Sequence, residues 1–205
     1  MSSTSKPALP SRPSLLSLGA AIFLFSFLAV VLLPKMQLPP LLPLLMLNDA
    51  LALLNTLFHE FGHIIFGFGG RALGVAGGTL AQILVPLTVM ISALRQRTPF
   101  APQVSLFWIG QNCIGISAYI ADASGLQLEY FQWWAAFGGQ YLEKGDPTVH
   151  DWHIMLGALH LLWADQILSF LVFGIGVLMM VAAAAWAYAP LPWWQQLWTE
   201  RLRRR

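Results

Sequence analysis

The sequence predicts an all-α integral membrane protein, built as a bundle of about five transmembrane helices with one short amphipathic helix. Apolar residues make up 57% of the 205 residues and charged residues only 10%, whereas soluble domains carry about 25% charged residues. The mean hydropathy is +0.65. Several apolar stretches are also long enough to form helices across a hydrocarbon layer of about 30 Å. We therefore expect a protein surrounded by membrane lipids.

The same composition excludes several classes of protein. So few charges cannot cover a soluble globule, and they do not support a disordered chain or a nucleic-acid-binding protein. The formal net charge is only +2. The single cysteine, Cys113, excludes an intrachain disulfide. The sequence gives no oligomeric state.

The first expected span covers residues 15–33 and ends at Pro34. It is longer than the apolar core of a signal peptide and no clear cleavage site follows it, so we interpret it as an anchor behind a polar tail at 1–14. The second span is expected to begin near Asn48, a good N-cap, and to end at Gly69.

A glycine-rich loop is then expected at 71–78, before a third span at 79–94 that Pro86 should kink. Asp165 is suited to cap the last span. A tail rich in Trp and Arg at 191–205 suits the membrane interface, so the membrane-embedded domain is 15–190. Between the third span and the tail, we expect a fourth span at 103–121, a segment at 122–151 that is too polar to cross the membrane, and a short amphipathic helix at 152–163. The last span is expected at 166–188.

Lys and Arg in short loops predict the orientation, because they favour the cytoplasmic side. The turn with Arg95 and Arg97 and the arginine-rich tail at 201–205 both favour the cytoplasm. Two spans separate this turn from the tail, so both can lie on the cytoplasmic side of the membrane. The acidic segment 122–151, which lies between those two spans, should then be outside. Five alternating spans then place the N-terminus outside, although Lys6 and Arg12 favour the cytoplasm.

The second span contains the main chemical signal, His59-Glu60-Phe61-Gly62-His63, an H-E-x-x-H sequence. Imidazoles four residues apart lie on one side of a helix and can bind one zinc ion (Zn2+) together. The glutamate between them is placed to take a proton from zinc-bound water. The pattern therefore predicts the core of a metallopeptidase, with His59 and His63 as ligands and Glu60 as the base.

The context of this motif supports a metal. The motif should lie about 15 to 21 Å from the start of its helix, inside the membrane, where ionisable groups cost several kcal/mol unless paired, metal-bound or facing water. We therefore expect metal binding rather than a metal-free polar core. The polar residues of the span share one side of the helix: Asp49, Asn55, Thr56, His59, Glu60, His63 and Gly67.

A catalytic zinc takes three protein ligands and keeps an open position. His150 is the expected third ligand, just before the amphipathic helix. Asp151 is the alternative: it could bind the ion, orient a ligand histidine, or simply cap the helix. Asp122 is a further candidate. His153 and His160 are expected to be surface or interface histidines.

The fourth span has a polar seam at spacings of three and four residues, which predicts one helix side facing other helices. We expect Asn112 and Tyr119 to hydrogen-bond inward, where they would stabilise a reaction oxyanion, orient a ligand, or only join helices. Gln82 of the third span is expected to bond across helices. The seam comprises Ser105, Trp108, Asn112, Gly115, Tyr119 and Asp122.

Four ordered motifs carry a family resemblance: HEFGHIIFGFGG, GGTLAQILVP, the stretch 108–123 and HDWH. Over residues 47–162 they resemble an uncharacterised bacterial membrane-protein family that looks like the site-two-protease-like zinc metallopeptidases. The resemblance implies an intramembrane protease of the bacterial inner membrane. Those proteases take their third ligand from an aspartate in an L-D-G or N-P-D-G motif. That motif is absent here, and Asp122 and Asp151 are the available substitutes.

The leading functional hypothesis is a membrane-embedded zinc endopeptidase that hydrolyses a membrane or membrane-proximal peptide. The alternative is a zinc-binding scaffold or assembly subunit of a membrane complex. A metal transporter is less favoured, because no repeated helices with matched breaks are visible. Tyr130, Trp133 and Trp134 would form a lid or exosite in the enzyme, or only lie at the interface.

Overall fold

The computed structural model describes residues 15–32, 42–98, 100–127 and 146–188. Of the described residues 86% are helical, and none of them lies in a strand. Five helices are long and apolar enough to cross a membrane, which confirms the all-α class and fits a multi-pass membrane protein. The helices are α1 Leu15–Leu32, α2 Leu42–Gly67, α3 Arg71–Gln96, α4 Ala101–Ala121, α5 Asp151–Ala158, the short 3-10 helix η3 Leu162–Ala164, and α6 Asp165–Tyr188.

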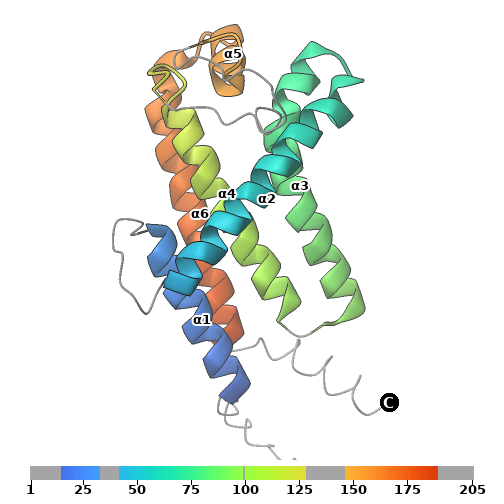
Figure 1. Ribbon diagram of the computed structural model, residues 1–205, viewed down its shortest axis with the longest axis vertical. Helices are drawn as coiled ribbons and strands as arrows, with labels where there is room; N and C mark the ends of the chain where they lie inside the picture. Colours follow the sequence, from blue (N-terminus) through green and yellow to red (C-terminus); the bar gives the residue numbers. More distant parts are fainter. Residues whose placement is uncertain (1–14, 33–41, 99, 128–145, 189–205) are drawn as a thin grey trace, which may run out of the picture.

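Helices α4 and α6 form the central pair of the bundle (Figure 1). A Cβ atom on Gly110 or on Gly176 would lie 2.7 Å from the backbone oxygen of the other residue. Such small residues let two helices approach closely inside a membrane. Helix α1 packs on this pair, where Phe27 stacks on Phe107 at a centroid distance of 5.3 Å beside the fully buried Met180.

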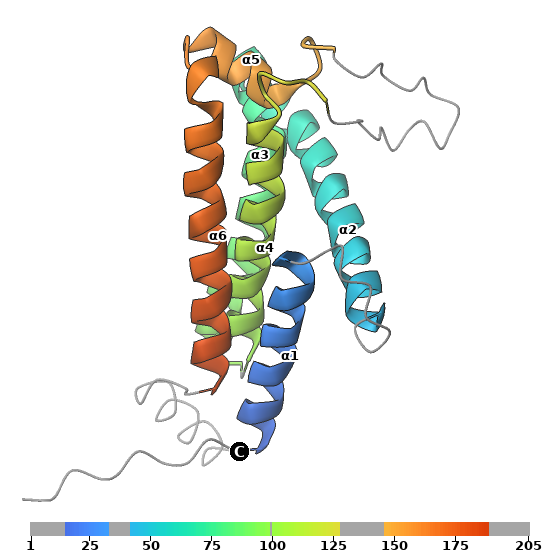
Figure 2. The ribbon, with the colours of Figure 1, turned by 90° about the vertical axis from the view of Figure 1, so that its left-hand side faces the viewer.

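Helices α2 and α3 form a hairpin whose tight turn contains Gly70, at φ 100°. Gly62 of α2 and Gly77 of α3 bring the two backbones together, since a Cβ on Gly62 would collide with the backbone oxygen of Gly77. Helix α3 in turn packs on α4. Helix α2 runs obliquely along the outside of the bundle and diverges from α3 away from the turn (Figure 2).

The two ends of the bundle carry different elements (Figures 1 and 2). Helix α5 and the ends of α2 and α4 lie at one end, whereas the start of α1, the α3–α4 turn and the end of α6 lie at the other. Helices α1 and α2 therefore run in the same direction. Leu44 and Leu45, near the start of α2, pack on the core around α1. The expectation that five spans alternate in direction is wrong for this first pair.

Two helices begin well before the residues that the sequence predicts, whereas α4 and α5 begin within two residues of them. Helix α2 starts at Leu42 rather than near Asn48, and Pro43 in its first turn is compatible with a helix start. Helix α3 starts at Arg71, so the expected glycine-rich loop at 71–78 is helical. Its glycines contact α2 closely, and this packing outweighs their weak helix propensity. Helix α3 also continues through Pro86.

The amphipathic segment is shorter than expected, because α5 ends at Ala158 and the chain turns through His160, at φ 58°, into η3. Asp165 was expected to cap the last span and is the first residue of α6. Its carboxylate accepts hydrogen bonds from the backbone N–H of Gln166 and from the backbone N–H and the hydroxyl of Ser124. The expected tails at 1–14 and 191–205 lie outside the described residues, as do Tyr130, Trp133 and Trp134.

Candidate metal centre

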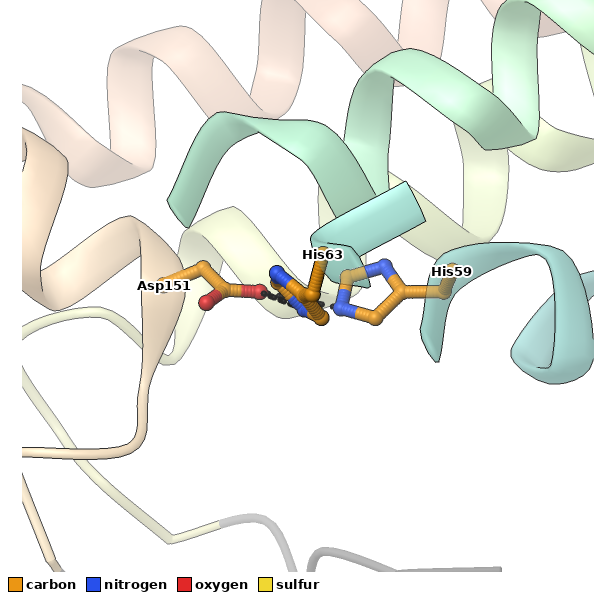
Figure 3. A group of neighbouring side chains, drawn as sticks. All are labelled: His59, His63 and Asp151. Carbon is orange, nitrogen blue, oxygen red and sulfur yellow. Dashed lines mark hydrogen bonds and ion pairs between the residues drawn. The ribbon is translucent and has the colours of Figure 1, made fainter. Parts of the chain in front are cut away.

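Three side chains from two helices converge at the α5 end of the bundle, and we call His59, His63 and Asp151 the candidate metal centre (Figure 3). Oδ2 of Asp151 lies 2.9 Å from Nε2 of His59 and 3.3 Å from Nε2 of His63. One donor atom from each residue lies within 4.8 Å of the others. The H-E-x-x-H spacing therefore turns both imidazoles toward one carboxylate.

The far side of each imidazole is held by an acceptor on α3. Nδ1 of His59 lies 3.1 Å from Oε1 of Gln82, and Nδ1 of His63 lies 2.7 Å from the backbone oxygen of Gly74. With an ion bound, such an acceptor would hold the ring proton on Nδ1 and leave Nε2 to bind the ion; in the structure, each Nε2 faces the Asp151 carboxylate instead. The prediction that Gln82 bonds across helices is confirmed.

Gly78 of α3 provides the space for the His59 ring. A Cβ atom at this position would lie 2.5 to 2.7 Å from three ring atoms of His59. Sequence reasoning missed both Gly78 and the acceptor role of Gly74, because these residues were expected to lie in a loop. The signal was available, since Gly74 and Gly78 have the four-residue spacing of small residues at close helix contacts.

Asp151 reaches the centre from the first position of α5, and the structure brings this residue to His59 and His63 in place of the expected His150. The His150 ring instead stacks on Tyr119, with centroids 4.2 Å apart, and its Nε2 lies 3.6 Å from Oδ2 of Asp122. His150 is the N-cap residue, with φ −90° and ψ 102°. Neighbouring side chains point to opposite sides where the backbone is extended. Only one of the two residues His150 and Asp151 can therefore face α2.

The centre is mostly buried but open on one side. The side chains of His59 and Asp151 are 13% and 10% exposed, while His63 is 28% exposed. Glu60 is half-buried and lies within electrostatic reach of all three residues. Burial raises the pKa of the Asp151 carboxyl, but hydrogen bonds from His59 and His63 outweigh it, so the pKa lies below its ordinary value. Asp151 therefore carries its negative charge at neutral pH.

The donor set fits a divalent metal ion. Imidazole nitrogen and carboxylate oxygen are ligand types that catalytic metal sites combine. Two donors that bind a tetrahedral ion at about 2.0–2.1 Å lie about 3.3 Å from each other, close to the two distances measured from Asp151. Acceptors behind both ring Nδ1 atoms complete the arrangement usual for metal-binding histidines.

Comparisons with models of protein families, with curated proteins and with solved structures found no match. The function is therefore inferred from the chemistry of the centre and from its place in the bundle.

The other predicted site residues do not join the centre. Asn112 is 2% exposed and donates to the backbone oxygen of Trp108, one turn earlier in α4. Asp122 faces His150 rather than the two centre histidines. Tyr119 accepts a hydrogen bond from the backbone N–H of Asp151 at 3.2 Å. Tyr119 thus contacts the chain that carries the third donor.

The remaining histidines and the polar seam of α4 have other partners. His160 is exposed as expected, whereas Nδ1 of His153 is bonded to the backbone oxygen of Ala123 at 2.7 Å. In the seam, Ser105 is buried as expected, but Gly115 is exposed.

A polar group nearer the middle of the bundle was only partly predicted. Asn55 donates to Oε1 of Gln111 at 2.8 Å, and Nε1 of Trp108 donates to Oδ1 of Asn55 at 2.8 Å. Gln111 was missed, because it lies beside the predicted seam rather than on it.

Proposed function

We propose that the protein is a membrane-embedded zinc metalloendopeptidase that hydrolyses membrane or membrane-proximal peptides. The observation that carries this proposal is the convergence of His59, His63 and Asp151, with Glu60 between the two histidines in the chain. The resemblance of the sequence to site-two-protease-like peptidases supports the same chemistry. Asp151 takes the place of the aspartate that those proteases carry on a later helix.

Each residue has a separate task in this proposal. His59, His63 and Asp151 would hold the zinc ion, which would supply a Lewis acid that makes bound water acidic near neutral pH. Glu60, half-buried beside the centre, accepts a proton from the attacking water. It then returns that proton to the amine that leaves when the peptide bond breaks. The carbonyl group of the peptide approaches the centre from the side of His63, which is more exposed than His59 and Asp151.

We further propose that the α5 end faces away from the cytoplasm in a bacterial inner membrane. The α3–α4 turn with Arg95 and Arg97 lies at the same end of the bundle as the start of α1 and the end of α6. Lys6, Arg12 and the arginines at 201–205 belong to the chain next to those helix ends. These residues are eight of the eleven Lys and Arg residues of the sequence, and they favour one side, which should be the cytoplasmic side with the C-terminus. Arg71, at the start of α3, lies at the other end.

One observation favours the alternative of a non-catalytic site. The carboxylate of Asp151 is hydrogen-bonded to both histidines, so the three side chains also fasten α5 to α2 without any chemistry. A scaffold or assembly subunit would need no more than this. Glu60 separates the two proposals, because only the enzyme needs its carboxylate.

The test combines metal content with the fate of membrane proteins. Protein purified in detergent should hold one zinc per chain by elemental analysis. His59→Ala and Asp151→Ala should lose the zinc, and Glu60→Gln should keep it. Cells producing Glu60→Gln should lack new peptide ends that wild-type cells generate in membrane proteins. Wild-type protein without zinc contradicts the metal centre, whereas equal peptide ends in both strains with zinc retained support the scaffold.

A further inference from the structure

The last turn of α4 and the residues that follow it hold the start of α5 through several independent contacts. The hydroxyl of Tyr119 accepts a hydrogen bond from the backbone N–H of Asp151 at 3.2 Å. The Tyr119 ring stacks on His150 at 4.2 Å, with planes 16° apart. His153 adds a bond from its Nδ1 to the backbone oxygen of Ala123 at 2.7 Å. These contacts come from residues on either side of Asp151, so they fix its backbone.

His150 connects this contact region to a second charge. The residue is 0% exposed, its Nδ1 accepts the backbone N–H of His153 at 3.2 Å, and its Nε2 faces Oδ2 of Asp122 at 3.6 Å. An Nδ1 that accepts leaves the proton on Nε2, where it points at the Asp122 carboxylate.

Tyr119 also lies against His59, a residue of the candidate metal centre on α2. Its ring lies edge-on to His59, with centroids 6.0 Å apart. It therefore contacts one centre histidine, the backbone of Asp151 and the ring of His150. A side chain between two ligands from different helices controls their separation, and metal affinity depends steeply on such supporting contacts.

We propose that Tyr119 and His150 are positioning residues, which set the place of Asp151 relative to His59 and His63 and so control the affinity and geometry of the metal centre. This inference rests on the proposed metal binding. The effect of Tyr119 and His150 is on where the third ligand lies.

The experiment compares three variants of the full-length protein in detergent. Tyr119→Phe removes the hydroxyl but keeps the ring, and His150→Asn keeps an N-cap acceptor but removes the stacked ring. Tyr188→Phe is the matched control, because Tyr188 is exposed at the opposite end of α6. Zinc affinity is measured by competition with a chromophoric chelator, and the visible spectrum of the Co2+-loaded protein reports the ligand geometry.

We expect Tyr119→Phe and His150→Asn each to weaken zinc binding by about 10–100-fold and to change the Co2+ spectrum, while Tyr188→Phe matches wild type. A purely structural role would lower stability without altering the spectrum of bound Co2+. Wild-type affinity and spectrum in both variants would overturn the inference. Wild-type protein that binds neither metal would instead overturn the proposed function.

A measurement on the unmodified protein covers the case in which a variant does not fold. Zinc should slow amide hydrogen exchange in residues 151–158, because binding at Asp151 holds the start of α5 in place. Exchange in these residues that is the same with and without bound zinc would contradict Asp151 as a ligand, and the inference would fall with it.

Discussion

At the scale of single residues, the candidate metal centre depends on the absence of a side chain at Gly78 as well as on its three converging side chains. Gly78 leaves the volume that the His59 ring occupies. Gly74 contributes a backbone oxygen to His63. Both glycines belong to α3. This helix therefore leaves space for one imidazole of α2 and accepts a hydrogen bond from the other. Changes on α3 should therefore alter metal binding without touching any ligand.

Gly78→Ala tests this directly. Its Cβ would lie 2.5 Å from the His59 ring, so the ring must move and we expect zinc affinity to fall by at least about tenfold. Gly174→Ala is the control, because its Cβ would meet nothing within 4 Å, and it should bind zinc like wild type. Chelator competition measures both. Unchanged affinity in Gly78→Ala would show that His59 binds no metal in this position.

At the scale of helices, α2 and α4 are joined through polar side chains rather than close backbone packing. Asn55 is 5% exposed and bonds both Gln111 and Trp108. Helix α2 otherwise packs mainly on α3. The amide of Asn55 thus joins the middle of α2 to the central pair of helices, beside the Phe58–Trp108 ring pair, whose centroids lie 6.1 Å apart.

Asn55→Ala should destabilise the bundle by about 1–3 kcal/mol, because it leaves the buried partners on α4 unsatisfied. The thermal midpoint in detergent measures the effect. Thr56→Ala is the matched control, since its hydroxyl only bonds the backbone oxygen of Ala52 within the same helix. Zinc content should stay at wild-type levels in both variants. Equal midpoints for the two variants would contradict this role of Asn55.

The sequence predicts elements with strong local patterns and misses those that depend on contacts between helices. The apolar stretches predict all five long helices, and the H-E-x-x-H spacing predicts that His59 and His63 face one point. The start of α3 was missed because its glycines are weak helix formers until α2 packs against them. The choice of Asp151 over His150 depends on backbone angles at the start of α5, which residue spacing does not encode.

At the scale of the whole molecule, the parallel course of α1 and α2 places the start of α1, the α3–α4 turn and the end of α6 at one end, and the candidate metal centre at the other. The predicted orientation can be tested by cysteine labelling after Cys113→Ala. Thr148→Cys is exposed just before α5, and Arg97→Cys is exposed in the opposite turn. A membrane-impermeant maleimide should label Thr148→Cys in spheroplasts and Arg97→Cys only after lysis. The reverse pattern would contradict the proposed orientation.

Metal binding should also stabilise the whole bundle. A ligand that binds only the folded state at 100 times its dissociation constant adds about 2.7 kcal/mol, so zinc should raise the thermal midpoint and a chelator should reverse this. Asp151→Asn is the control, because a neutral amide replaces the charged donor while the helix start is kept. A zinc-induced rise of equal size in Asp151→Asn would show that the ion binds elsewhere.

The distance along the chain between His59 and Asp151, 92 residues, has a consequence for biosynthesis. A nascent chain that has inserted only α1 to α4 carries both histidines but no third donor from α5. If the centre hydrolyses peptides as we propose, it stays incomplete while the chain is being synthesised and inserted, and no cleavage is expected at that stage. The activity we propose begins only when α5 has been synthesised and has docked onto the end of α4.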